Sequence, residues 1–157
     1  MEERIELKFL LDLADYHNLK RQLDLFMKED EFQTHDHGYR LSSLYFDDMY
    51  DSATHDKADG VEYHRKFRIR MYEDGRKRLE YKIKNGNLTM KETLVLDDDM
   101  EKALVGRDYS MIEKKLDLPL IKELFLKMKV DNLEVRQYVD YFREIYIFNN
   151  NEVRITF

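Results

Sequence analysis

Charged and apolar side chains alternate along much of two consecutive segments in the middle of the chain, 62–72 and 78–84, and a third segment, 88–96, is also typical of a strand. Successive side chains of a β-strand point to opposite faces, so this alternation predicts strands with one charged face and one apolar face. The segments are separated by Glu73-Asp74-Gly75 and Asn85-Gly86-Asn87, which are typical of hairpin turns. The middle of the chain is therefore predicted to form an antiparallel sheet.

The rest of the chain adds helices and further strands to this sheet. Alternation predicts strands at 4–11, 39–47, 134–148 and 152–157. Helices are expected at 13–28 after the N-cap Asp12, at 50–57 as a short helix or turn, at about 97–106, and at 120–129 after Pro119. These elements predict an α+β fold in one domain.

The composition excludes several classes of protein and site. The chain has 157 residues, of which 43% are hydrophobic, enough for one domain with a substantial core. It has no cysteine, so disulfides and thiolate zinc sites are excluded. No apolar run approaches the roughly 18 residues that a membrane span needs, and residues 1–4 do not resemble a signal peptide. We therefore expect a cytoplasmic protein without membrane insertion.

Basic residues are concentrated in one part of an acidic chain. The net charge is −6, which argues against nucleic-acid binding. Residues 57–91 nevertheless contain eleven Lys and Arg against five Asp and Glu, a local charge of +6, whereas the remainder contains 16 basic and 28 acidic residues. This distribution favours a local site for an anion.

The predicted strands place these basic residues on one face. Lys66, Arg68 and Arg70 share a face of one strand, and Lys82 and Lys84 share a face of the next. Like charges that face each other across strands are unfavourable, so an anion such as a linear polyphosphate or a nucleoside triphosphate would stabilise the arrangement. The alternative is a solvated sheet face with scattered salt bridges.

Several motifs together resemble a known family. They are Glu6-Leu7-Lys8-Phe9, Ser43-Leu44-Tyr45-Phe46-Asp47, Lys66-Phe67-Arg68-Ile69-Arg70-Met71-Tyr72, Leu79-Glu80-Tyr81-Lys82 and Val153-Arg154-Ile155-Thr156-Phe157. In this order they resemble the VTC domain, the polyphosphate polymerase domain of the triphosphate tunnel metalloenzyme superfamily. The resemblance extends over essentially the whole chain.

The resemblance implies a closed antiparallel β-tunnel with flanking helices and basic walls, in which polyphosphate is made from ATP with a divalent metal, manganese or magnesium. The residues it implies for catalysis are Lys8, Arg68, Arg70, Lys82 and Arg143. Further phosphate contacts are expected from Lys57, Lys66, Lys84, Lys91, Tyr141 and Arg154. Glu6 and Glu80 are candidate metal ligands, with pairing to Lys8 and Lys82 as the alternative role.

One departure from the family pattern affects the expected activity. Family domains continue beyond the last strand of this chain with a second Glu-x-Lys strand, whose Glu binds the metal, and a closing Ser-Lys-Tyr strand. We therefore expect residues 1–157 to be a single tunnel domain that is truncated at its C-terminus and inactive by itself. Its unpaired strand edges predict self-association.

Three other functions are considered. The first is a non-catalytic polyanion-binding module, which the missing metal carboxylate favours. The second is a triphosphate hydrolase of the same superfamily. Its alternating ExExK signature is not matched, because Arg4 stands where the first glutamate would be. The third is a purely structural domain with an exposed charged face.

Overall fold

The structure is a computed structural model that describes residues 2–5, 7–30, 38–58, 61–86, 88–148 and 153–157. It consists of two compact units, which are considered separately. The first contains Met1–Glu6 and Ser42–Val139, and the second contains Leu7–Leu41 and Asp140–Phe157. The expected α+β class with antiparallel strands is confirmed.

The described residues form five helices and nine strands. The helices are α1 Leu13–Leu23, α2 Ser52–Ala58, α3 Asp98–Gly106, α4 Tyr109–Glu113 and α5 Pro119–Val130. The strands are β1 Glu2–Ile5, β2 Lys28–Glu29, β3 Tyr39–Asp47, β4 Tyr63–Tyr72, β5 Lys77–Asn85, β6 Leu88–Leu96, β7 Glu134–Arg143, β8 Ile145–Phe148 and β9 Val153–Thr156.

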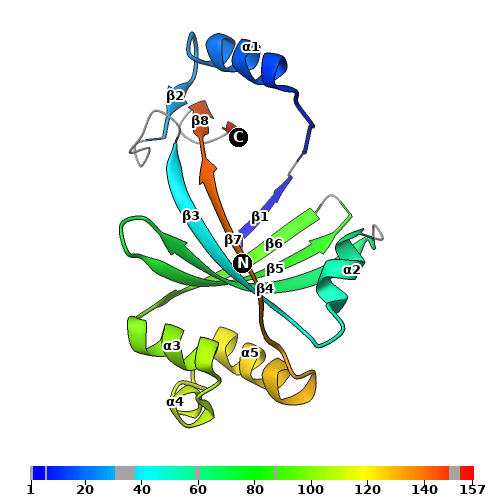
Figure 1. Ribbon diagram of the computed structural model, residues 1–157, viewed down its shortest axis with the longest axis vertical. Helices are drawn as coiled ribbons and strands as arrows, with labels where there is room; N and C mark the ends of the chain where they lie inside the picture. The colour runs from blue at the N-terminus through cyan, green and yellow to red at the C-terminus, as the bar shows by residue number, and fades with distance from the viewer. Residues whose placement is uncertain (1, 6, 31–37, 59–60, 87, 149–152) are drawn as a thin grey trace. The chain divides into compact units, whose positions relative to one another are not determined.

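The first unit contains the predicted sheet. Strands β4, β5 and β6 follow one another in sequence and pair antiparallel, in a six-stranded order β1-β6-β5-β4-β3-β7. Gly75 and Gly86 lie in the two connecting turns with φ of 84° and 57°, a backbone conformation that glycine adopts without strain. Figure 1 shows α3, α4 and α5 together on one side of this sheet.

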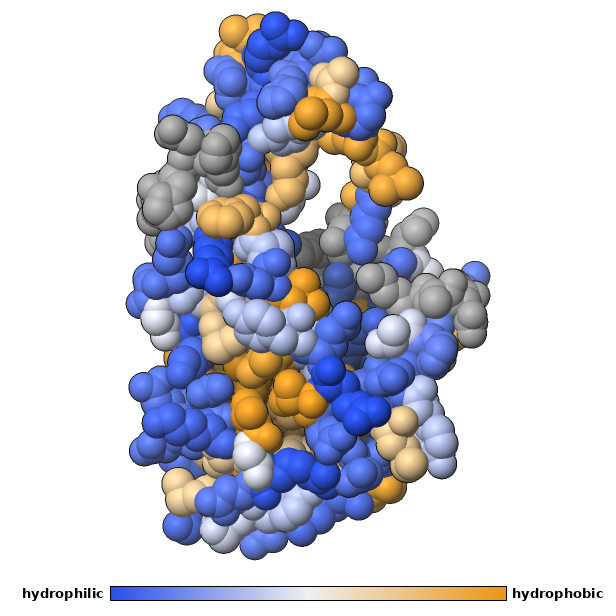
Figure 2. All heavy atoms as spheres, in the orientation of Figure 1, coloured by the Kyte–Doolittle hydropathy of each residue, from blue (hydrophilic) through white to orange (hydrophobic). Residues whose placement is uncertain are grey.

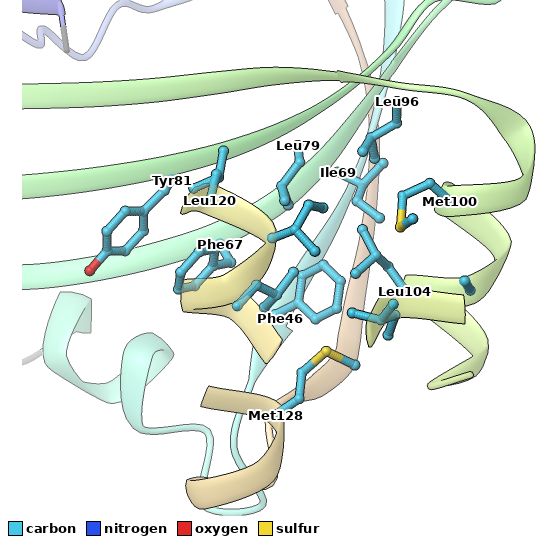
Figure 3. Close-up of a cluster of buried hydrophobic side chains, with 14 residues drawn as sticks. Phe46, Phe67, Ile69, Leu79, Tyr81, Leu96, Met100, Leu104, Leu120 and Met128 are labelled. Carbon is cyan, nitrogen blue, oxygen red and sulfur yellow. The ribbon is translucent and has the colours of Figure 1, made fainter. Parts of the chain in front are cut away.

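The apolar face of the sheet packs against these helices. Ile69 and Leu79 are neighbours across β4 and β5, and Phe67 and Tyr81 stack with ring centroids 4.2 Å apart. Leu104 of α3 and the other helical residues labelled in Figure 3 fill the space below the strands. This burial of one sheet face fixes the strand register, because a slip of one residue would turn the charged side chains into the core.

The second unit has a smaller core. Strands β2, β8 and β9 form a three-stranded sheet, and Leu23, Met27 and Tyr146 are buried together. Asp12 caps α1 as predicted, since its carboxylate accepts a 2.7 Å hydrogen bond from the Asp15 N–H. The segment that leads into α1, residues 7–11, carries exposed apolar side chains, which appear as hydrophobic spheres in Figure 2.

Three predicted elements differ from the structure. The strand expected at 4–11 is β1, which ends at Ile5 because its partner β6 begins at Leu88, and residues 7–12 form no regular element. Helix α1 ends at Leu23 rather than at residue 28. The long strand expected at 134–148 is divided at Glu144, whose backbone pairs with Phe157, so that β8 joins a different sheet from β7.

The expected β-tunnel, predicted to be incomplete in this chain, is not confirmed. Among the described residues, β1 and β7 are the edges of the larger sheet, and β2 and β9 are those of the smaller one. Within the described part of the chain, no helix has both the length and the apolar character needed to cross a membrane.

Candidate functional site

Cross-strand pairing brings most of the predicted basic residues of the first unit onto one sheet face. Lys66, Lys82 and Lys91 form one row across β4, β5 and β6. The adjacent rows are Arg68 with Glu80, Arg70 with Arg78, and His64 with Lys84. We call this surface the cation face and define it by Lys66, Arg68, Arg70, Arg78, Glu80, Lys82, Lys84 and Lys91.

Glu80 is the centre of the cation face. Its side chain is 1% exposed. One carboxylate oxygen, Oε2, accepts hydrogen bonds from Arg68 Nε at 2.7 Å and lies 2.6 Å from Arg68 Nη2. The other oxygen, Oε1, lies 3.5 Å from Arg70 Nη1 and 4.0 Å from Lys91 Nζ. A single buried carboxylate therefore faces three cations.

The charges of this cluster decide its protonation. Burial alone would raise the pKa of Glu80, but the charges of Arg68 and Arg70 outweigh it and hold that pKa below its ordinary value. Burial would likewise lower the pKa of Arg68, but the Glu80 charge raises it above its ordinary value. Glu80 and Arg68 are therefore both charged near neutral pH.

Strands β4, β5 and β6 place more basic than acidic side chains on the cation face. Among the strand residues that point to this side from β4, β5 and β6, Glu80 is the only acid, against seven Lys and Arg. Lys82 lies directly between Lys66 and Lys91, an unfavourable arrangement for like charges. Arg and Lys side chains in such an array can bind the oxygens of a phosphate chain from several sides.

Buried polar atoms of the first unit also lack hydrogen bonds. In the described part of the chain, Glu80 Oε1, Thr89 Oγ1 and Ser43 Oγ are buried and have no hydrogen-bond partner. Thr89 lies opposite Lys84 and therefore on the cation face. Buried polar groups normally find partners, so these atoms are exceptions within the core of the first unit.

Two contributors were missed by the sequence reasoning. Tyr45 of β3 accepts a 3.1 Å hydrogen bond from Arg68 Nη1 through its hydroxyl oxygen. Arg78 extends the face by one step of the β5 alternation. Alternation along 43–47 could have identified Tyr45, because Leu44 and Phe46 on either side pack in the core.

The remaining predicted residues lie elsewhere. Lys8, Tyr141, Arg143 and Arg154 belong to the second unit. Lys8 is exposed in a segment without regular structure, contrary to the strand expected there, and Arg154 Nη2 lies 3.3 Å from the buried Asp30 carboxylate. Tyr141 and Arg143 are half-buried near the end of β7.

Glu6 and the side chain of Lys57 lie outside the described residues. The expected pairing of Glu80 with Lys82 is replaced by pairing with Arg68, because Arg68 is directly opposite Glu80 in the register.

The described residues contain no cluster of three or more His, Asp or Glu that could hold a metal by itself. Glu80 is the predicted metal ligand in this part of the structure, and of its two carboxylate oxygens Oε1 has no hydrogen bond. A hard divalent cation takes about six oxygen ligands, so the cation face could supply one of them at most.

A separate cleft of about 290 Å³ lies beside α2 and is lined by Asp47, Asp48, Arg65, Lys127 and Asp131, among others. Asp47 is occupied there, since its carboxylate accepts hydrogen bonds from the backbone N–H groups of Ala53 and Thr54. Its acidic groups make this cleft unsuitable for a phosphate chain, so the cation face is the candidate site.

A comparison with protein families is consistent with a site for a phosphate anion. The family model described as the VTC domain matches residues 3–157. The chain belongs to the VTC domain family. VTC domains are polyphosphate-related. Polyphosphate is an anion, and the positive charges of the cation face suit it. No curated protein matches this VTC domain.

Proposed function

We propose that this VTC domain binds linear oligophosphate anions, namely polyphosphate, tripolyphosphate or the triphosphate of ATP, on the cation face. The observation that carries the proposal is the cluster at Glu80, where one buried carboxylate faces Arg68, Arg70 and Lys91. A bound phosphate chain would neutralise the excess charge and supply acceptors for the Arg and Lys N–H groups.

The roles of the residues follow from their geometry. Arg70 is buried, Arg68 is partly buried, and both contact Glu80, so they are suited to fix one phosphoryl group in a defined orientation. Lys66, Lys82 and Lys91 form a row of point charges along which successive phosphates could lie. In phosphoryl transfer these contacts would position the reacting groups and stabilise the charge that develops on the phosphate oxygens.

The proposal extends to a divalent metal, manganese or magnesium, that accompanies the phosphate. Glu80 Oε1 is the one described carboxylate oxygen on the cation face that could contribute to it, and phosphate oxygens and water would complete the shell. Arg70 and Lys91 lie close to the same oxygen and oppose a cation in the absence of phosphate. We therefore expect no manganese binding to the domain alone, measured by calorimetry.

Binding without catalysis is the second candidate function. It is favoured by the small number of carboxylates on this side of the sheet, where Glu80 is the only one contributed by β4, β5 and β6 and Glu2 of β1 lies opposite Lys91. Incubation with ATP and manganese, followed by detection of polyphosphate on gels, distinguishes the two. Polyphosphate formation supports a phosphotransferase, whereas binding without turnover supports a polyanion-binding module.

Calorimetric titration with tripolyphosphate tests the proposed binding. Lys82→Gln removes one charge from the centre of the lysine row and should weaken binding by about threefold to tenfold, the effect of a partly exposed ion pair. Arg65→Gln is the matched control, because Arg65 lies on β4 beside Lys66 but points to the opposite face. Equal losses in both variants, or no binding by the wild type, would contradict the proposal.

A further inference from the structure

Arg68 is held at two points that leave part of its guanidinium group available. A guanidinium carries five N–H donors. Glu80 Oε2 accepts one from Nε and lies 2.6 Å from Nη2, and the Tyr45 hydroxyl oxygen accepts one from Nη1. Each terminal nitrogen therefore keeps at least one N–H donor for which the described residues supply no hydrogen-bond acceptor. A pair of this kind matches two oxygens of a phosphate group.

The contact with Glu80 does not by itself fix the direction of these two donors. The hydrogen bond from Arg68 Nε and the ion-pair contact of Nη2 converge on the same carboxylate oxygen, Oε2. The guanidinium plane could pivot about that single oxygen, as it could not about a carboxylate that bound it through both oxygens. A second anchor on a different nitrogen is needed to stop this motion.

Tyr45 supplies the second anchor from the neighbouring strand. β3 lies next to β4 in the sheet, and the Tyr45 hydroxyl bonds Arg68 Nη1 at 3.1 Å, on the nitrogen that Glu80 does not contact. The Arg68 Cζ also lies 5.8 Å from the centre of the Tyr45 ring, within the range of a cation–π interaction. Leu44 and Phe46 pack in the core on either side, which holds the backbone of Tyr45 in place.

We infer that Tyr45 is a positioning residue, which directs the two remaining N–H donors of Arg68 toward the phosphate chain. The inference rests on the proposed binding of oligophosphate to the cation face and adds a residue to which no role has been assigned above. Tyr45 acts through Arg68, so its contribution to binding should disappear when Arg68 can no longer present two donors.

A double-mutant cycle tests this dependence. Tripolyphosphate dissociation constants are measured by calorimetry for the wild type, Tyr45→Phe, Arg68→Lys and the double variant. Tyr45→Phe keeps the ring and removes only the hydroxyl, and it should weaken binding by about threefold to tenfold, the effect of losing one hydrogen bond to a charged group. In the Arg68→Lys background the same change should alter the affinity by less than about twofold.

Tyr138→Phe is the matched control. Its hydroxyl also bonds a side chain of β3, Ser42 Oγ at 3.0 Å, but it contacts no cation of the cation face among the described residues. This variant should bind tripolyphosphate as the wild type does. Urea unfolding of every variant separates a loss of affinity from a loss of folded protein.

The outcomes separate the two proposals. If the wild type does not bind tripolyphosphate, or if Arg68→Lys binds it equally well, the proposed site on the cation face is wrong. If Arg68→Lys weakens binding but Tyr45→Phe does not, the site stands and the role of Tyr45 is refuted. An equal loss from Tyr45→Phe in both backgrounds also refutes that role, because it would be independent of Arg68.

Discussion

Glu80 is placed to affect both the stability of the fold and the proposed binding of an anion. Its carboxylate is buried, an environment that opposes a charge, yet its contacts with Arg68, Arg70 and Lys91 keep it ionised. Those cations are themselves held in place by the carboxylate. Removing its charge should therefore destabilise the fold and at the same time increase the attraction for an external anion.

We predict that Glu80→Gln lowers the free energy of unfolding by about 3 kcal/mol at neutral pH, because three cations lose their buried counter-charge. Urea denaturation measures this. Glu92→Gln is the control, since Glu92 lies on β6 on the opposite face of the sheet from Lys91. Tripolyphosphate should stabilise Glu80→Gln more than the wild type. A smaller stabilisation would contradict the role of Glu80 as counter-charge.

The pH dependence of this effect has a defined sign. The pKa of Glu80 lies below its ordinary value of 4.5 in the folded protein, so its contribution is complete above that pH and is lost as the pH falls through the lower folded value. The difference in unfolding free energy between the wild type and Glu80→Gln should therefore shrink under acidic conditions. A difference that stays constant as the pH falls would refute this assignment.

The raised pKa of Tyr81 predicts a loss of stability at alkaline pH. Burial raises the pKa of Tyr81 to about 12, so the folded protein favours the neutral phenol. Its contribution is complete below pH 10, the ordinary value, and is lost as the pH rises toward 12. The free energy of unfolding of the wild type should therefore fall as the pH rises above 10. In Tyr81→Phe this fall, measured by urea denaturation, should be smaller by about 1–2 kcal/mol. Tyr50→Phe, at an exposed position, should retain that loss.

Individual residues of the site could be predicted only in part. The alternation placed Lys66, Arg68, Arg70 and Lys82 on one face, and the register confirms it. The partner of Glu80 could not be predicted, because it depends on which residue of β4 lies directly opposite. Tyr45 was missed because its contribution comes from a hydroxyl on another strand rather than from a charge pattern.

In the second unit, position 38 requires a glycine. Its φ is +85°, and a Cβ atom built there would lie 2.0 Å from the backbone oxygen of Arg143. Gly75 in the turn between β4 and β5 has nearly the same φ, +84°, but a Cβ there would meet nothing within 4 Å. At both positions a non-glycine residue would be strained by the positive φ. Only at position 38 would its Cβ atom also clash with the backbone.

We predict that Gly75→Ala costs about 1 kcal/mol, the strain of a non-glycine residue at positive φ. Gly38→Ala should cost more than about 3 kcal/mol, because backbone atoms rather than a flexible side chain must move. Urea denaturation of both variants measures the difference. Equal costs would mean that the close approach of Gly38 to Arg143 is absent in solution.

Elements with a sustained pattern were predicted well, and those set by distant partners were not. The strand expected at 88–96 is β6 without change, and α3 and α5 lie where their capping residues indicated. β1 is shorter than expected because its pairing with β6 ends at Leu88, the first residue of β6. The division of β7 from β8 depends on backbone pairing of Glu144 with Phe157, which alternation along one strand does not reveal.

At the scale of the whole molecule, the sheet edges predict self-association. β7 is an edge strand of the larger sheet as described, and the Tyr138 side chain on it is 56% exposed. Exposed edge strands pair readily with another copy. We predict that the average mass measured by light scattering rises with protein concentration and that Tyr138→Lys reduces the rise. A constant monomer mass over the whole concentration range would refute this.

The position of the cation face within the sequence has a consequence for synthesis in the cell. β4, β5 and β6 are consecutive and pair locally, so they can form a sheet soon after residue 96 is added. The helices that cover its apolar side end only at Val130, so Phe67 and Leu79 stay exposed to water while the ribosome makes this stretch, for a few seconds at about 5–20 residues per second. During that interval the apolar side of the sheet needs protection from aggregation.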